Sequence, residues 1–441
     1  MATARQSLET RRTLLERLAD VRLRTDALFG AVKPEHIYER PIPERHRIVF
    51  YIGHLEAFDW NLLREPIGDI APSRPELDRL FAFGIDPVGG GLPTDQPGDW
   101  PAIEVVRDYN AAVRQALDEG LAEAARGEGS DDSLRQRLNV AIEHRLMHEE
   151  TLSYMLHQLP YEKKVWQPQA PAPAGARRPE AGMIEIPAGT ARLGLERNED
   201  AFGWDNEFEA HDASVPAFSI DRYMVTNGEY LKFLEAGGYD DRSLWSEPAW
   251  QWKNSRGIRH PAFWKRDDGR WLWRGMFDEF PLPSDWPVYV SLAEAGAYAR
   301  WAGKALPSEA QWHRAAYGMP KGSARLFPWG NELPSARRGN FDFGRWDPVA
   351  VDAHPEGESA WGVSGMPGNG WEWTSSVFAP FPGFERFPFY PGYSANFFDG
   401  KHFTMKGGSP RTAAAMLRRT FRNWFQPHYQ YVYAGFRCVS A

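Results

Sequence analysis

The chain has 441 residues, of which 42% are hydrophobic and 25% charged, as is typical of a soluble globular protein with two or three domains. A formal net charge of −8 argues against a nucleic acid or an anionic membrane as partner, and no run approaches the roughly 18 apolar residues of a membrane span. The start of the chain lacks an apolar signal segment, and the single cysteine, Cys438, cannot form an intrachain disulfide. We therefore expect a cytoplasmic protein, and the sequence leaves its oligomeric state open.

The first 164 residues have apolar side chains at the spacing of amphipathic helices. This pattern predicts helices over residues 7–32, 47–63, 101–126 and 132–159. Residues 65–100 are rich in Pro and Gly, and we expect them to be irregular. Four helices with one long connection describe a bundle, and metal sites are often built in bundle interiors by side chains of facing helices.

Two histidines, His144 and His148, stand four residues apart in the last of these helices, so both project from one face. A third, His54, lies on the apolar stripe of the second helix. A lone buried histidine is more often a hydrogen-bonded core residue, but three neutral imidazoles can hold a divalent transition metal and leave coordination positions open. This pattern alone does not separate zinc from iron. Glu150 points about 200° away from His148 around the helix, which favours an orienting role over ligation.

The composition changes abruptly at residues 165–182, which are rich in Pro and Ala and predict a semi-rigid linker. Beyond it come short strand-like runs, many turns, aromatic loops and only a few helical segments. We expect helices at residues 227–236, 292–301 and 309–317. The prediction is an α+β protein with a metal-binding four-helix bundle over residues 1–164, a linker, and an irregular domain over residues 183–441.

The stretch His144-Arg-Leu-Met-His148-Glu-Glu150, with the upstream His54, resembles the His-x3-His-x-Glu signature of the ergothioneine-synthase family. In that family a helical domain of the DinB type is fused to a domain of the formylglycine-generating-enzyme fold, a variant of the C-type lectin fold. The resemblance covers nearly the whole chain, since the second half carries matching motifs in order. These are Met183-Ile-Glu-Ile-Pro-Ala-Gly189, Phe202-Gly-Trp-Asp-Asn-Glu207, Tyr223-Met-Val-Thr-Asn-Gly-Glu-Tyr230, Leu306-Pro-Ser-Glu-Ala-Gln-Trp312, Phe327-Pro-Trp-Gly330, Gly368-Asn-Gly-Trp-Glu-Trp373 and Gly407-Gly-Ser409.

The resemblance implies a non-haem Fe(II) enzyme in which His54, His144 and His148 hold the iron. The implied reaction is the oxidative attachment of sulfur or selenium to the imidazole of hercynine, the betaine of histidine, with O2 as co-substrate. Formylglycine generation is not expected, because the aerobic enzymes of that fold use a pair of cysteines and this chain has only Cys438.

The resemblance also implies roles for residues of the second domain. Tyr390 matches a tyrosine that donates a proton or hydrogen atom in the oxygen-dependent step, and Tyr393 lies near it; simple packing in an aromatic loop is the alternative. Asn423 and Trp424 match residues that hold the trimethylammonium and carboxylate end of hercynine, and a Trp face attracts a quaternary ammonium. We expect the active site in the cleft between the domains, with iron from the first and substrate-binding side chains from the second.

Departures from the family pattern bear on the donor. Where the donor is γ-glutamylcysteine, an acid follows the Asn-Trp pair and an arginine comes a few positions later, whereas Phe425 and the residues after it, including Gln430, supply neither. Met147 replaces a glutamine with which some members contact the hercynine imidazole. A neutral aromatic pocket leaves the charged ends of a dipeptide unpaired but suits a hydroxyl-rich sugar. These changes favour the selenoneine synthase branch, which joins a selenosugar to hercynine.

Three alternatives remain. The chain could be an ergothioneine synthase that uses γ-glutamylcysteine or cysteine, or an ovothiol-type synthase, although the methyltransferase domain usual in the latter is missing. It could also be a non-catalytic lectin-like binding protein whose histidines are structural or hold zinc. The position of His54 distinguishes the enzyme from the binding protein. If His54 lay far from His144 and His148, the enzyme interpretation would be wrong.

Overall fold

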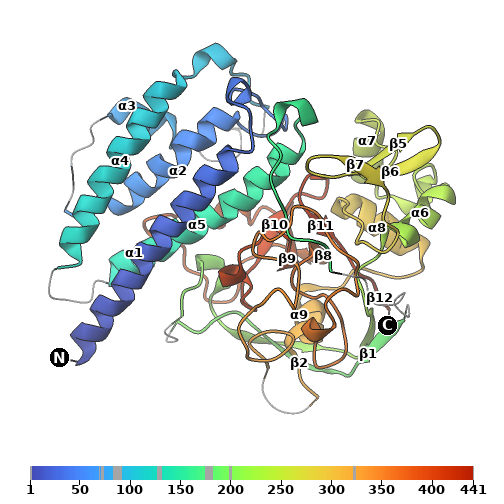
Figure 1. Ribbon diagram of the computed structural model, residues 1–441. Helices are drawn as coiled ribbons and strands as arrows, with labels where there is room; N and C mark the ends of the chain where they lie inside the picture. The colour runs from blue at the N-terminus through green and yellow to red at the C-terminus, as the bar shows by residue number, and fades with distance from the viewer. Residues whose placement is uncertain are drawn as a thin grey trace. The chain divides into compact units, whose positions relative to one another are not determined.

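The computed structural model describes residues 2–440 apart from residues 69, 71–73, 83–91, 127–131, 174–181, 198–200 and 321–323. It consists of two compact units, Met1–Gln167 and Pro168–Ala441 (Figure 1). The division falls inside the predicted Pro- and Ala-rich linker, of which residues 174–181 lie outside the described residues.

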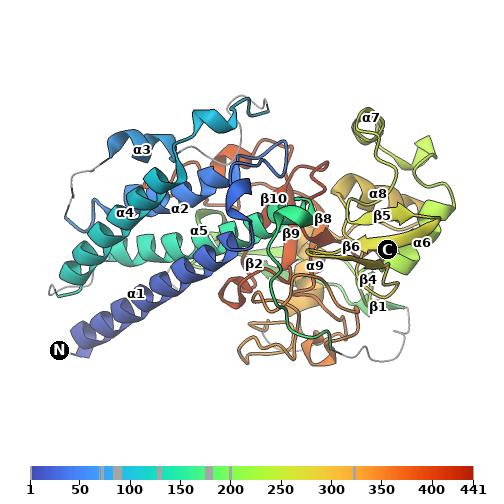
Figure 2. The same cartoon turned by 45° about the horizontal axis from the view of Figure 1, so that its top comes forward.

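The first unit is built from long helices that run alongside one another (Figures 1 and 2). Its helices are α1 (Ala2–Phe29), α2 (Ile48–Leu63), the short α3 (Pro75–Leu80), α4 (Ile103–Ala124) and α5 (Asp132–His157). The four long ones lie where the apolar spacing predicts them, while α3 lies within the stretch expected to be irregular. Among the residues described, none of the helices combines the length and apolarity that a bilayer crossing demands.

Amphipathic spacing explains why these segments are helical and how they pack. The buried side chains of α4 recur every three or four residues, at Val106, Tyr109, Val113, Leu117 and Leu121. Helix α2 is buried nearly all round, since it contacts α3, α4 and α5, and α1 packs against α5. The helix that carries His54 is therefore central to the unit.

The second unit has helices α6 (Asn227–Glu235), α8 (Leu292–Trp301) and α9 (Glu309–Tyr317) close to the predicted positions. Each begins with a capping box, in which a Thr or Ser and a Glu or Gln three residues later satisfy each other's backbone N–H groups. Helix α7 (Glu247–Ser255) is absent from the sequence prediction. Its N-cap residue, Ser246, makes no side-chain capping bond, and the start of α7 therefore lacks the signal that the other three share.

The described strands of this unit form small sheets. They are β1 (Met183–Ile186), β2 (Gly189–Leu193), β3 (His211–Val215), β4 (Phe218–Asp221), β5 (Trp264–Asp267), β6 (Arg270–Arg274), β7 (Glu279–Pro281), β8 (Gly370–Val377), β9 (Phe403–Gly408), β10 (Asn423–Phe425), β11 (Ala434–Gly435) and β12 (Val439–Ser440). The sheet orders are β1-β4-β12, β10-β9-β8-β11, β2-β3 and β5-β6-β7, and only β11 and β8 pair in parallel. The predicted α+β organisation, a helical bundle followed by an irregular sheet-containing domain, is confirmed.

The four-stranded sheet positions the candidate substrate residues. Strand β10 forms its edge, with Trp424 opposite Thr404 of β9. Its central strand β8 carries Glu372, whose carboxylate accepts from Arg437 Nε at 2.6 Å and from Nη2 at 2.8 Å. Both side chains are fully buried, and the guanidinium also donates to backbone carbonyls such as Ser364 O at 3.0 Å. This pair anchors the sheet to the C-terminal segment.

Replacing Glu372 by Gln should lower the free energy of unfolding by about 3–5 kcal/mol, because the buried guanidinium of Arg437 loses its counter-charge. The measurement is urea unfolding followed by tryptophan fluorescence. The control is Glu247→Gln, which breaks an exposed pair with Arg242 and should change stability by less than about 1 kcal/mol. Equal effects of the two substitutions would contradict the anchoring role.

Candidate functional site

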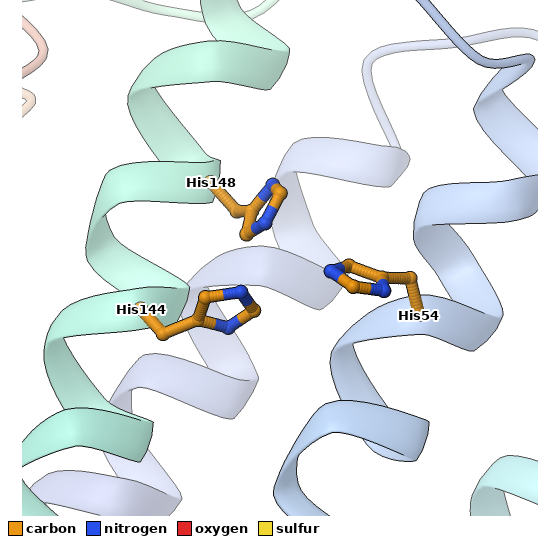
Figure 3. Close-up of side chains that lie close together, drawn as sticks. All are labelled: His54, His144 and His148. Atoms are coloured by element: carbon orange, nitrogen blue, oxygen red, sulfur yellow. The ribbon is translucent and has the colours of Figure 1, made fainter. Parts of the chain in front are cut away.

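Three histidine side chains converge in the first unit. His144 and His148 project from α5 toward His54 on α2 (Figure 3). One ligand nitrogen from each can be chosen so that all lie within 4.8 Å of one another. Among the residues that the structure describes, this is the one group of three or more His, Cys, Asp or Glu side chains that converges in this way. The proximity of His54 thus meets the condition on which the enzyme interpretation depends.

The three imidazoles are buried, with exposed fractions of 4% for His54, 4% for His144 and 1% for His148. Burial lowers the pKa of His54 to about 4 and holds the pKa values of His144 and His148 well below the usual range, with further lowering by neighbouring positive groups. All three rings are therefore neutral at pH 7, and a neutral imidazole is the form that binds a metal.

The hydrogen bonds of these rings leave nitrogen lone pairs for an ion. His54 Nδ1 lies 2.7 Å from the backbone oxygen of Phe81, and because a carbonyl only accepts, Nδ1 carries the proton and Nε2 the lone pair. Both nitrogens of His148 and Nδ1 of His144 are buried without a hydrogen-bond partner among the described residues. Buried polar atoms without partners are costly, and a divalent transition ion would satisfy them. The residues fit such an ion.

Packing fixes the orientation of these rings. The ring of Phe58 stacks on His144 with centroids 3.5 Å apart, and Phe50 stacks on His54 at 4.9 Å. Next to His54, a Cβ atom on Gly53 would lie 2.6 Å from the ring of Phe81. Glycine is therefore required there for the Phe81 carbonyl to reach the imidazole.

A buried ionic network lies beside the histidines. The guanidinium of Arg145, which is fully buried, donates to Asp59 Oδ2 at 2.8 Å and to Glu56 Oε2 at 2.7 Å. Arg114 of α4 donates to Glu56 at 2.6 Å and to Asp26 of α1 at 2.7 Å. The network ties α1, α2, α4 and α5 together one residue from His144 and two residues from His54.

Two other predicted positions lie on α5. Met147 is half-buried, and a contact with substrate stays a prediction. Glu150 is buried but does not belong to the converging group of histidines, in keeping with its predicted orientation.

In the second unit, predicted residues cluster around Trp424. Tyr390 and Tyr393 have ring centroids 5.6 Å apart, and Tyr393 stands edge-on to Trp424 at 5.4 Å. Asn423 and Phe425 flank Trp424 on β10. Burial, with a smaller effect of Asp205, raises the pKa of Tyr390 to about 12, so its phenol is protonated at neutral pH and can donate.

Aromatic side chains surround Trp424. Phe378 stacks on it with centroids 4.1 Å apart and an interplanar angle of 8°, and Phe397 lies at 5.5 Å. Together with Tyr393, these rings form an aromatic surround of Trp424, and its contact with hercynine stays a prediction.

The loop after Trp424 is neutral and aromatic. Phe425 stacks on Tyr429 at 4.9 Å, and Tyr431 stands edge-on to Tyr429 at 5.4 Å. His428 stacks on Trp252 of α7 at 5.0 Å. Gln430 is half-buried in this loop, and residues 425–433 contain neither acid nor arginine.

Sequence reasoning missed several contributors to these clusters. Glu56 and Asp59 are the two carboxylates of an otherwise largely apolar helix, and that contrast was an available signal. Phe378 and Phe397 had no signal, because they reach Trp424 from segments that no local spacing connects.

Two family models match the chain. That of the DinB superfamily matches residues 17–152, and that of the sulfatase-modifying factor enzyme 1-like domain matches residues 168–441. A protein named hercynine oxygenase from Mycolicibacterium smegmatis is 35% identical over 445 residues, covering 97% of this chain and 98% of the relative. Ergothioneine biosynthesis protein 1 of Neurospora crassa is 28% identical, covering 92% of this chain and 55% of that protein. The structure of PvdO from Pseudomonas aeruginosa is 23% identical, with a TM-score of 0.40 over 58% of this chain and 93% of PvdO.

A DinB-type helical unit with three converging histidines, joined to a sulfatase-modifying-factor-like domain, defines the class of protein. The chain belongs to the hercynine oxygenase family of oxidoreductases, which also includes the fungal ergothioneine biosynthesis proteins. The family prediction made from the histidine signature and the motifs of the second half is confirmed.

Replacing His148 by Ala should abolish binding of Fe(II), because one of three nitrogen donors is removed. The affinity should fall by more than about 100-fold, since loss of a ligand's supporting partner alone costs 10- to 100-fold. Anaerobic equilibrium dialysis measures the bound iron. His36→Ala, at a half-buried histidine of the same unit, is the control and should bind iron like the wild type. Undiminished iron in the His148→Ala variant would remove the metal-site assignment.

Proposed function

We propose that this protein is an Fe(II)- and O2-dependent enzyme that forms a carbon–selenium bond on the imidazole of hercynine, with a selenosugar as donor. The observation that carries the proposal is the convergence of His54, His144 and His148 in a chain of the hercynine oxygenase family. In the reaction, an imidazole C–H bond and the donor's Se–H bond are broken and one C–Se bond forms. The two protons and two electrons that are released pass to O2.

The metal assignment follows from the ligands and the reaction. Three neutral imidazoles leave positions open for substrates on a divalent ion. Bound Fe(II) would supply one-electron chemistry with O2, which zinc does not. The aromatic stacking of Phe50 and Phe58 would keep water away from the histidines and hold their rings in place.

In this proposal the second unit binds hercynine and handles the proton. Asn423 and Trp424 take the trimethylammonium and carboxylate end, supported by the aromatic surround of Trp424. Tyr390 donates the proton or hydrogen atom from its phenol, and Tyr393 orients it. Met147 of the first unit supplies an apolar contact to the imidazole.

The donor assignment rests on the loop after Trp424. The stacked rings of Phe425 and Tyr429 and the amide of Gln430 suit a sugar, whose C–H faces pack on aromatic rings and whose hydroxyls bond to amides. The charged ends of γ-glutamylcysteine would lack partners in residues 425–433. A selenosugar is therefore favoured.

A second candidate function, ergothioneine synthesis, also has specific support. Proteins named for ergothioneine biosynthesis align with 92% of this chain, which favours an ergothioneine synthase using cysteine or γ-glutamylcysteine. Formylglycine generation is disfavoured, because the single Cys438 is fully buried and burial raises the pKa of its thiol.

A competition experiment tests the function and the donor together. The Fe(II)-loaded protein is incubated with hercynine, O2 and an equimolar mixture of a selenosugar, its thiosugar analogue, cysteine and γ-glutamylcysteine, and products are identified by mass. The expected main product carries the selenosugar. Preference for a thiol amino acid would establish the ergothioneine alternative. Absence of any hercynine-dependent product, with stoichiometric zinc in the purified protein, would favour a binding protein.

Changing Tyr390 to Phe should lower turnover by about 10²- to 10⁴-fold or redirect the products, because the proton donor is lost. Iron content should be unchanged. Product analysis by mass and iron quantification are the measurements, and Tyr393→Phe provides the matched comparison, with a smaller expected effect. A larger effect at Tyr393 would exchange the two roles.

A further inference from the structure

Four consecutive residues, Trp204 to Glu207, form a buried turn that the proposed reaction does not use. Each is at most 1% exposed. Asp205–Glu207 is a short 3-10 helix, closed by the backbone N–H of Trp204 donating to Glu207 Oε1 at 2.9 Å. Burying two carboxylates in four residues is costly unless each is bonded. The hydrogen-bond partners of Asp205 and Glu207 therefore show which segments the turn fixes in place.

One side of the turn holds the segment that carries the tyrosines. The ring of Trp204 stacks on Tyr393 with centroids 3.9 Å apart and lies 6.4 Å from Tyr390. Asp205 Oδ1 accepts from the hydroxyl of Ser394 at 2.6 Å, and Ser394 is fully buried. Both contacts hold Tyr393 and Ser394, three and four residues after the proposed proton donor Tyr390.

The other side of the turn holds the approach to β10. Glu207 accepts from Arg418 Nε at 2.8 Å and from the Thr420 hydroxyl at 2.5 Å. The backbone oxygen of Asn206 accepts from Arg422 Nη1 at 3.2 Å. Arg422 immediately precedes the Asn423–Phe425 strand, so these contacts fix where that strand begins.

We propose that Asp205 and Glu207 are positioning residues. Asp205 holds Tyr390 and Tyr393 through Ser394, and Glu207 holds Asn423 and Trp424 through Arg418 and Thr420. The turn thereby sets the distance between the proton donor and the group that binds the trimethylammonium end. The inference rests on the proposed function and assigns neither residue a contact with substrate.

The two carboxylates differ in their surroundings. The paired charge of Arg418 outweighs burial and lowers the pKa of Glu207, which is a fixed anion. Asp205 has no such cation; its Oδ2 is buried without a hydrogen-bond partner among the described residues, and burial raises its pKa to about 6. Hydrogen bonds from Ser394, from Asn206 and from the backbone of Phe387 oppose that rise. Asp205 therefore acts as a hydrogen-bond acceptor, and an acceptor oxygen matters there more than a charge.

Kinetics and binding separate the two roles. Asp205→Ala and Ser394→Ala should each lower kcat by about 10-fold or more, because misplacement by about 1 Å can cost 10²-fold, while the hercynine dissociation constant measured by calorimetry stays within about two-fold. The double variant should be no slower than the slower single variant. Asp205→Asn, which keeps an acceptor oxygen, should recover part of kcat.

Glu207→Gln should instead raise the hercynine dissociation constant by about 10-fold, with a smaller effect on kcat. Thr420→Val removes one bond to Glu207 and provides a milder variant with the same direction of change. The matched control is Glu229→Gln, which weakens an equivalent capping box on Thr226 at the start of α6 and should change neither quantity.

Hydrogen–deuterium exchange gives a readout independent of turnover. Exchange should rise in residues 387–394 in the Asp205 and Ser394 variants and in residues 418–425 in the Glu207 and Thr420 variants, each without change in the other segment. A uniform rise, no rise, or equal changes in kcat and binding for all variants would overturn the positioning roles. Failure of the proposed function is distinct, since the wild type itself would then form no hercynine-dependent product.

Discussion

The contact of Arg145 with Glu56 and Asp59 determines how α5 lies against α2, and the histidine cluster depends on that placement. Arg145 follows His144 directly, so a shift of α5 by one residue would turn the histidines by about 100° away from His54. Buried ion pairs add little net stability, but separating one leaves an uncompensated charge in the core. The network therefore acts chiefly against alternative registers of the two helices.

The two units handle polar chemistry in different ways. The first places neutral nitrogens among aromatic rings and pairs the buried charges beside them in one network. In the second unit, aromatic rings stack in layers. The guanidinium of Arg422 lies over Phe378 at 4.8 Å, and Phe378 stacks on Trp424. This layering contributes to the 14% aromatic content, because each stacked ring needs a further ring or a guanidinium against its other face.

Apolar periodicity was sufficient for most of the helices and for the histidines, since it acts within a few residues. It located α8 and α9 to the residue but missed α3 and α7. Strand pairing could not be predicted from the sequence, because β11 and β12 have two residues each and pair with β8 and β4, which are far away in the sequence. The motif containing Trp204 was visible in the sequence, but its contacts to Ser394 and Arg418 required the fold.

The bond from His54 to the carbonyl of Phe81 has an evolutionary consequence. A backbone acceptor is present whatever side chain occupies position 81, so substitutions there leave the imidazole tautomer intact, provided that the new side chain still packs against Gly53. An insertion or deletion within α3, by contrast, would rotate the Phe81 carbonyl away from the His54 ring. The identity of residue 81 is therefore constrained by its packing against Phe50, Trp100 and Tyr109, and the length of α3 by the position of the carbonyl, a constraint on spacing that no residue motif displays.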